Sequence, residues 1–254
     1  MHPREFMDNF WTIEDTKRVF VMMAFAHHAV WKNIIEKAIT KSKLQPDRAD
    51  VPLSGPIPDK ILEGIFNARI ILVDLSPQLL KDGKTEDQIT MKYLYNWNVA
   101  YELGIAHAVR QKEEVILISQ TREAMPFDIH HWNIHQYSPD NIKNSINKIR
   151  DLLNNANQSI DISKSLLVER DSRKLDNKCI DLMRSSKNTS IVDPDPDKTK
   201  YKLALGSPNE LYFVAAIQKL LDLNLIRSII NTEGSEVLYE WTNKGRATLK
   251  YLNL

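Results

Sequence analysis

Short, nearly continuous apolar runs mark three predicted strands in the first part of the chain, at 18–24, 68–75 and 114–119. Runs of this length are typical of strands that are buried on both faces of a parallel sheet. Two further strands are predicted, one in the polar segment 45–51 and one at the edge of the sheet over 131–137.

Between the strands, apolar residues recur every three or four positions, which is the period of helices packed on one side. These predicted helices cover 31–39, 59–67, 98–110 and 140–155. The long polar segment 76–97 is predicted to be a loop. Strands that alternate with helices predict an α/β fold over 1–157, with a doubly wound parallel sheet and right-handed crossovers.

The chain changes character after residue 157. Residues 158–205 are polar and charged, with a predicted helix over about 166–183 and alternating Asp and Pro at 193–197, so we expect a helical, Pro/Asp-rich linker. Residues 206–254 predict a helix, two strands around a Gly-containing turn at 231–235, and a final helix that begins after Trp241. Helix, hairpin and helix in this order resemble the end of a winged-helix domain.

Composition limits the classes of function. The chain has 254 residues, of which 43% are hydrophobic, and its formal net charge of +1 gives no general attraction to nucleic acid or acidic membranes. The single cysteine, Cys179, excludes an internal disulfide framework and a cysteine-rich zinc site. No apolar run reaches the ~18 residues of a membrane span, and the N-terminus lacks the apolar core of a signal peptide. We therefore expect a cytoplasmic protein that does not bind membranes.

The predicted topology gathers polar residues at one edge of the sheet, because ligands of such sheets bind outside the carboxyl ends of the strands. Five polar or aromatic residues lie at or just after the ends of the first three strands: Phe25, Arg48, Asp50, Asp74 and Ser76. Glu102, on the helix that follows the third strand, is expected to meet them there. The helix predicted over 98–110 places Glu102 in its first turn, one turn after Asn98, a good helix-capping residue. The simplest alternative is that Glu102 only complements the helix dipole.

Several motifs carry a family resemblance. They are VFVMMAF at 19–25, the Arg48-Ala49-Asp50 step, ILVDLS at 71–76, and NVAYELGIAHA at 98–108 followed by VILIS at 115–119. In this order they resemble the nucleoside 2-deoxyribosyltransferase-like and TIR-like nucleotide-binding superfamily of bacteria, over about residues 18–138.

The resemblance implies chemistry at an N-glycosidic bond. The glutamate that matches Glu102 attacks the anomeric carbon in the transferases and supports cleavage of the nicotinamide–ribose bond of NAD in TIR-type members. A carboxylate suits both reactions because their transition state has oxocarbenium character. The resemblance further implies that Asp74 lies near sugar hydroxyls or the base, that Asn98 orients Glu102, and that Arg48 binds a phosphate or carboxylate.

Each of these assignments has a structural alternative. Asp74 could cap a turn, Arg48 could form a surface ion pair with Asp47 or Asp50, and Tyr101 could pack against the core instead of stacking on a base. No metal is expected at His27 and His28, because no third ligand stands at a suitable spacing. His130, His131 and His135 could supply a general acid or form a surface loop.

Two classes of function remain open. The first is cleavage or transfer of an N-glycosidic bond of NAD or a related nucleotide or nucleoside through Glu102, as in bacterial defence effectors. The second is a regulator that binds a nucleotide without turnover and signals through the C-terminal module. No separate cofactor is expected, and a homo-oligomer is favoured. DNA binding is disfavoured because residues 206–254 carry five basic and five acidic residues, so a protein partner is preferred for this module.

Overall fold

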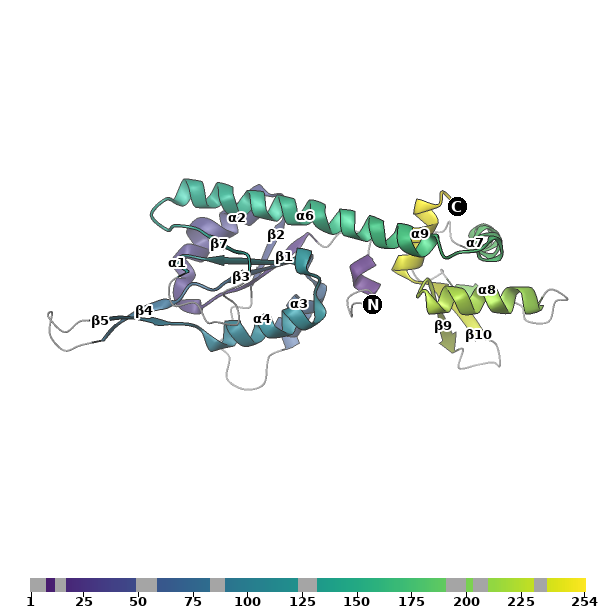
Figure 1. Ribbon diagram of the computed structural model, residues 1–254, viewed down its shortest axis with the longest axis horizontal. Helices are drawn as coiled ribbons and strands as arrows, with labels where there is room; N and C mark the ends of the chain where they lie inside the picture. Colours follow the sequence, from purple (N-terminus) through teal and green to yellow (C-terminus); the bar gives the residue numbers. More distant parts are fainter. Residues whose placement is uncertain are drawn as a thin grey trace. The chain divides into compact units, whose positions relative to one another are not determined.

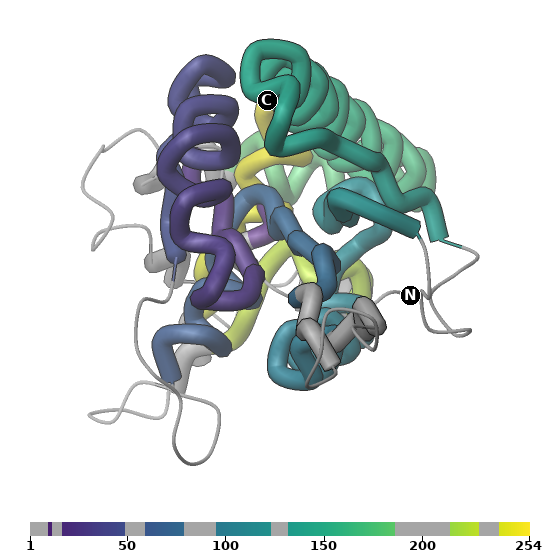
Figure 2. Tube along the Cα trace, turned by 90° about the vertical axis from the view of Figure 1, so that its left-hand side faces the viewer, coloured from purple at the N-terminus to yellow at the C-terminus, as the bar shows by residue number. Residues whose placement is uncertain are grey.

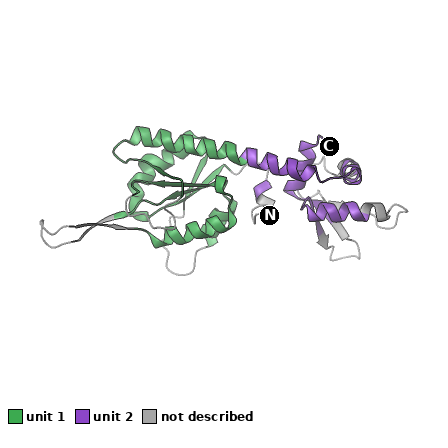
Figure 3. Ribbon diagram, viewed as in Figure 1, with its two compact units in different colours: residues 1–4, 15–160 green, residues 5–14, 161–254 purple. Residues whose placement is uncertain are grey.

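The computed structural model describes residues 8–11, 17–48, 59–82, 90–122, 132–190, 200–202, 210–230 and 237–254. These residues form two compact units (Figure 3): the first ends at Ile160, and the second begins at Asp161 and includes the short helix η2 (Asp8–Trp11). Across the described ranges, no helix combines the length and the apolar character needed to cross a membrane.

The first unit is built on a five-stranded parallel sheet, which confirms the predicted α/β class. Its strands are β1 (Arg18–Met22), β2 (Gln45–Arg48), β3 (Ile70–Asp74), β6 (Val115–Ser119) and β7 (Ile134–Gln136). Their order in the sheet is β2-β1-β3-β6-β7, the 2-1-3-4-5 order of a flavodoxin-like sheet. β2 is an edge strand, where Pro46 costs no ladder hydrogen bond.

Both faces of this sheet are covered, because side chains alternate between two apolar clusters along each strand. Val19, Val21 and Leu72 pack on one face, and Phe20 and Val73 on the other. The first face carries the segment α1 (His28–Val30), η4 (Trp31–Ile35) and α2 (Glu36–Lys41), together with the start of α6 (Ile142–Ser172). The second carries α3 (Asp59–Asn67) and α4 (Trp97–Val109), as Figures 1 and 2 show. Layers on both faces agree with a doubly wound arrangement.

Close packing fixes the position of the helices on the second face. A Cβ at Gly64 would overlap the Phe20 ring, so the glycine lets α3 lie against β1. Arg110, wholly buried after the end of α4, donates hydrogen bonds to four carbonyl oxygens near the end of α3, those of Ile65, Phe66, Ala68 and Arg69. These carbonyls lack helical partners, so Arg110 ties α4 firmly to α3.

Residues 76–97, which we predicted to be a loop, contain two strands. β4 (Gln78–Asp82) and β5 (Thr90–Leu94) pair antiparallel in a two-stranded sheet of their own, which projects from the main sheet in Figure 1. The expectation of an irregular segment was wrong because β4, in which Leu79 and Leu80 are adjacent, lacks the alternation that marks a strand.

The second unit combines helices with a small antiparallel sheet. Its elements are α7 (Asn177–Ser190), β8 (Lys200–Lys202), α8 (Glu210–Asp222), β9 (Ile226–Ile230), β10 (Val237–Trp241) and α9 (Asn243–Tyr251). β9 and β10 pair antiparallel as predicted, β8 adds a third strand that was not predicted, and the turn at 231–236 lies outside the described residues. Gly245 is required at the start of α9, because a Cβ there would overlap the carbonyl oxygen of Leu225.

The predicted linker differs from what the structure shows. The helix expected over 140–155 continues as α6 to Ser172, and the helix expected over 166–183 is divided between α6 and α7. Cys179 and Met183 of α7 pack in one apolar cluster with Ala216 and Leu220 of α8. α7, which lies within the predicted linker, therefore contributes to the core of the second unit.

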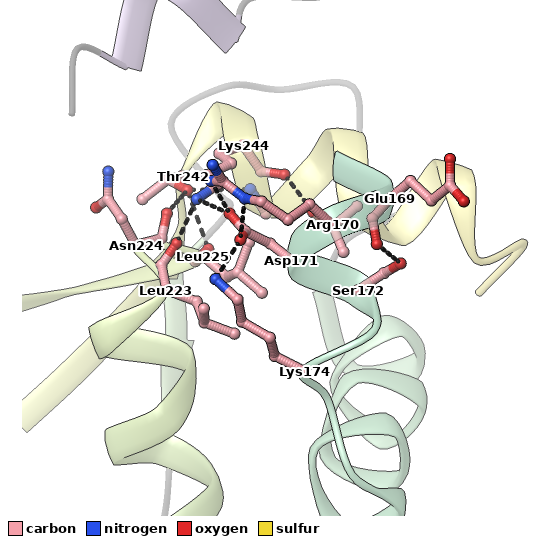
Figure 4. A network of polar contacts seen from close by, with 12 residues as sticks. Glu169, Arg170, Asp171, Ser172, Lys174, Leu223, Asn224, Leu225, Thr242 and Lys244 are labelled. Carbon is pink, nitrogen blue, oxygen red and sulfur yellow. Dashed lines mark hydrogen bonds and ion pairs between the residues drawn. The ribbon is translucent and has the colours of Figure 1, made fainter. Parts of the chain in front are cut away.

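A buried ion pair holds the end of α6 to α9 within this unit (Figure 4). Lys244 Nζ lies 2.7 Å from Asp171 Oδ2 and donates a hydrogen bond to the carbonyl oxygen of Leu223 at 2.7 Å. Burial by itself would raise the pKa of Asp171, but hydrogen bonds from Arg170, Lys174 and Lys244 outweigh it and hold this pKa well below its ordinary value.

Candidate functional site

α4 begins one residue earlier than predicted, and Asn96 caps it instead of Asn98. The Asn96 side chain accepts hydrogen bonds from the backbone N–H groups of Asn98 (3.0 Å) and Val99 (3.3 Å). Glu102 consequently lies beyond the first turn, which contains no acidic residue. The helix dipole acts mainly within the first turn, so it gives a weaker account of Glu102 than the sequence suggested.

Glu102 lines a pocket at the carboxyl ends of β1 and β2. The pocket is small and partly open to solvent. It is lined by Phe20, Val21, Met22, Met23, Phe25, Arg48, Ile61, Asn96, Asn98, Val99 and Glu102. Four of the residues singled out from the sequence thus meet there: Glu102, Asn98, Arg48 and Phe25.

The Glu102 carboxyl group sits in a poorly hydrated part of this pocket. Glu102 is only 8% exposed, and its neighbours Val99 and Leu103 belong to the apolar cluster beneath α4. Burial raises the pKa of Glu102 from 4.5 to about 7. A carboxyl group with this pKa exists in both protonation states near neutral pH, which suits acid–base or nucleophilic chemistry.

Arg48 brings a positive charge to the same pocket. It is 7% exposed and therefore buried, and Asp50, one of its two ion-pair candidates, lies outside the described residues. Its Cζ atom lies 5.3 Å from the centre of the Phe25 ring and 5.6 Å from that of Trp31, within the range of cation–π attraction. Both rings therefore lie beside the guanidinium group at the end of β2.

Asp74 and Ser76 form a separate polar network and are not among the described residues that line the pocket. Asp74 accepts hydrogen bonds from the Tyr137 hydroxyl (2.8 Å), from the Ser76 backbone N–H (3.0 Å) and from the Ser76 hydroxyl. The Ser76 hydroxyl also accepts one from the Gln120 backbone N–H at 2.8 Å. Asp74 therefore caps the turn after β3, as the structural alternative proposed, and joins β3 to β6 and β7.

The remaining candidates either do not line the pocket or fall outside the described residues. Tyr101 is 62% exposed and is not a lining residue, and Asp50 is outside the described part of the chain. His130 and His131 are also outside it. The pKa of His135 is lowered by burial and by the charges of Lys148 and Arg122, and the pKa of His107 is lowered by burial to about 4. No group of three or more His, Cys, Asp or Glu side chains in the described ranges is placed to hold a metal ion.

Sequence reasoning overlooked three residues that shape these sites. Asn96 lines the pocket and caps α4, the Trp31 ring lies within cation–π range of Arg48, and the Tyr137 hydroxyl donates a hydrogen bond to Asp74. Asn96 had a recognisable signal, since Asn96 and Asn98 are both capping residues at the start of the same apolar pattern. For Trp31 and Tyr137 the sequence pattern predicted no polar contact, because their partners Arg48 and Asp74 are distant in the sequence.

Comparison of the chain with protein-family models found no matching family, and comparison with curated proteins found no match.

Proposed function

We propose that this protein cleaves or transfers an N-glycosidic bond of NAD or a related nucleotide or nucleoside, with Glu102 as the reacting carboxylate. The observation that carries the proposal is the buried Glu102 carboxyl group, whose pKa is raised to about 7, in a pocket that also holds Arg48, Asn98 and Phe25. The family resemblance of the motifs around Asp74 and Glu102 supports the same chemistry.

The buried Glu102 carboxylate favours a reaction that develops positive charge beside it. An ionised Glu102 is poorly solvated, and a cationic centre beside it supplies the stabilisation that water does not. As the bond between the anomeric carbon and the base nitrogen breaks, its electron pair leaves with the base and the sugar becomes cationic. Glu102 then stabilises this cation or forms a covalent bond to the anomeric carbon, which water or a second base breaks.

The other lining residues have matching roles in substrate binding. Arg48 carries a planar guanidinium that can bind a phosphate through two parallel hydrogen bonds. Phe25, which is 43% exposed, presents an aromatic face beside Arg48 for a base or a sugar. Asn98, which is exposed and lines the pocket one turn before Glu102, offers an amide to sugar hydroxyls.

The test is to incubate the purified full chain with NAD, NADP, ribonucleosides and 2′-deoxyribonucleosides, and to separate released bases by chromatography. We expect the wild type to release a base from at least one substrate class. Glu102→Gln keeps the size of the side chain but removes the nucleophile, so base release should fall by about two orders of magnitude or more.

Glu63→Gln is the matched control, because Glu63 is an exposed residue on α3 of the same unit. It should leave base release unchanged. Arg48→Lys separates substrate classes, since loss of the planar fork should raise KM for phosphorylated substrates more than for nucleosides. Tight nucleotide binding by calorimetry without base release from any substrate, even at high protein concentration, would overturn the enzymatic proposal in favour of a nucleotide-sensing regulator.

A further inference from the structure

The outward face of α4 carries no charged residue. Every exposed residue of this helix is uncharged: Trp97, Asn98, Ala100, Tyr101, Gly104 and Ala108. By contrast, α3, α6, α7, α8 and α9 each expose at least one Asp, Glu, Lys or Arg. A surface helix normally keeps its charged residues on the solvent side, so the outward face of α4 has the composition of a buried surface.

Two large aromatic side chains dominate this face. Trp97 is 76% exposed and Tyr101 is 62% exposed. With Gly104 and Ala108 they form a stripe along one side of the helix, at spacings of four, three and four residues. These are the spacings of the contact positions in a two-helix coiled coil. A Cβ built on Gly104 would meet no atom within 4 Å beyond its own helix backbone, so the stripe is open at this point.

We propose that the outward face of α4 binds the same face of a second copy of this chain, with the two helices antiparallel. A two-fold axis over the turn between Tyr101 and Gly104 places Tyr101 opposite Gly104 of the second copy. The same axis places Trp97 opposite Ala108 of the second copy. Each large ring therefore meets a small residue, which is the complementarity that allows two helices to approach closely.

Charge also favours a second copy as the occupant. An uncharged face that meets a charged partner must remove that charge from water without supplying a counter-ion, which is costly. The same face of a second copy brings no charge, and a two-fold contact closes after two copies. The pairing thus places each aromatic ring against a small residue and buries no unpaired charge.

The contact area predicts a weak, concentration-dependent dimer. The exposed parts of Trp97 and Tyr101 amount to on the order of 300 Å² per copy. Stable interfaces bury about 800 Å² per partner, so the two aromatic side chains supply less than half of that area. We therefore expect a monomer–dimer equilibrium that shifts with protein concentration. Asn98 belongs both to this face and to the pocket, so the interface borders the candidate site.

Gly104→Arg gives the sharpest test, because Gly104 has open space in the single chain but lies under Tyr101 of the second copy in the proposed dimer. Sedimentation velocity over about a hundredfold range of concentration should show dimer formation by the wild type. Gly104→Arg should remain monomeric over the same range, with an unchanged circular dichroism spectrum. Asn33→Arg is the control, since it adds the same charge at an exposed position of η4 and should dimerise as the wild type does.

Tyr101→Ala provides a second variant that needs no new charge, and it should weaken dimerisation at least tenfold. A wild type that is monomeric at all concentrations would overturn the proposal. Dimerisation of Gly104→Arg or of Tyr101→Ala with the affinity of the wild type would overturn it as well, because the contact would then lie elsewhere.

Discussion

Asp74 and Glu102 belong to opposite faces of the five-stranded sheet. Asp74 follows Ile70 and Leu72 in the alternation of β3, and its carboxylate accepts a hydrogen bond from Tyr137, which packs on that same face. Glu102 lies on α4, whose Val99 and Leu103 pack on the other face with Ile71 and Val73. The two carboxyl groups therefore have different surroundings. Asp74 accepts hydrogen bonds at the carboxyl end of β3, whereas Glu102 lines the pocket.

Tyr137→Phe should destabilise the fold by about 1–2 kcal/mol. The substitution removes a hydrogen bond to the buried Asp74 carboxylate and leaves the space filled. Urea unfolding followed by circular dichroism measures the loss. Tyr251→Phe is the control, because Tyr251 is half exposed at the end of α9, and it should leave the midpoint unchanged. Equal midpoints for both variants would show that the Asp74 network adds no stability.

Glu102 should make the fold less stable as pH rises from about 4.5 to about 7. In this window the unfolded chain loses the proton at Glu102 while the folded chain keeps it, because burial raises the pKa in the folded state. The free energy of unfolding thus falls by at most about 1.4 kcal/mol per pH unit from this group, and the fall stops above about pH 7. The penalty is absent below about pH 4.5, where both states are protonated.

The measurement compares wild type with Glu102→Gln by urea unfolding at a series of pH values. The variant should gain stability relative to wild type across this window and hold a constant advantage above it. If the difference in the free energy of unfolding between the two proteins is constant from pH 4 to pH 8, the result contradicts a raised pKa for Glu102.

Asn96→Ala should cost about 1 kcal/mol of stability, whereas Asn98→Ala should cost little. Asn96 supplies the side-chain cap of α4, and the exposed Asn98 side chain faces the pocket opening. Thermal unfolding separates the two effects, and the activity assay completes the comparison. Asn98→Ala should lower base release in a protein of normal stability. A larger loss of stability in Asn98→Ala than in Asn96→Ala would show that Asn98 is the cap of α4.

Lys244→Met should be destabilising, by about 1–3 kcal/mol, because it removes the closest cation of the wholly buried Asp171, which keeps its hydrogen bonds from Arg170 and Lys174. The double variant Asp171→Leu/Lys244→Met removes both charges and should recover a large part of the loss. Denaturant unfolding of the four members of this cycle gives the coupling between the two residues. Lys250→Met, at an exposed position of α9, is the control and should be neutral. Additive losses in the double variant would contradict the coupling.

Local patterns predicted much of the first unit. The helix expected over 59–67 is α3, and the buried runs at 18–24, 68–75 and 114–119 contain β1, β3 and β6. These elements could be predicted because a helix packed on one side repeats its apolar residues every 3.6 positions, and a strand buried on both faces is a short continuous apolar run. The rule that ligands bind at the carboxyl ends of parallel strands also brought Glu102, Arg48 and Phe25 together correctly.

The sequence by itself determined the α/β class and the parallel sheet, and it placed Glu102 on the helix that follows the third strand. Only the tertiary structure decided that Asp74 turns away from the pocket toward Tyr137, that α7 belongs to the core of the second unit, and that Lys244 pairs with Asp171. The reason is that each of these contacts joins residues far apart in the chain. Periodicity records which positions are buried, but the partner of a buried polar group is set by how whole elements pack.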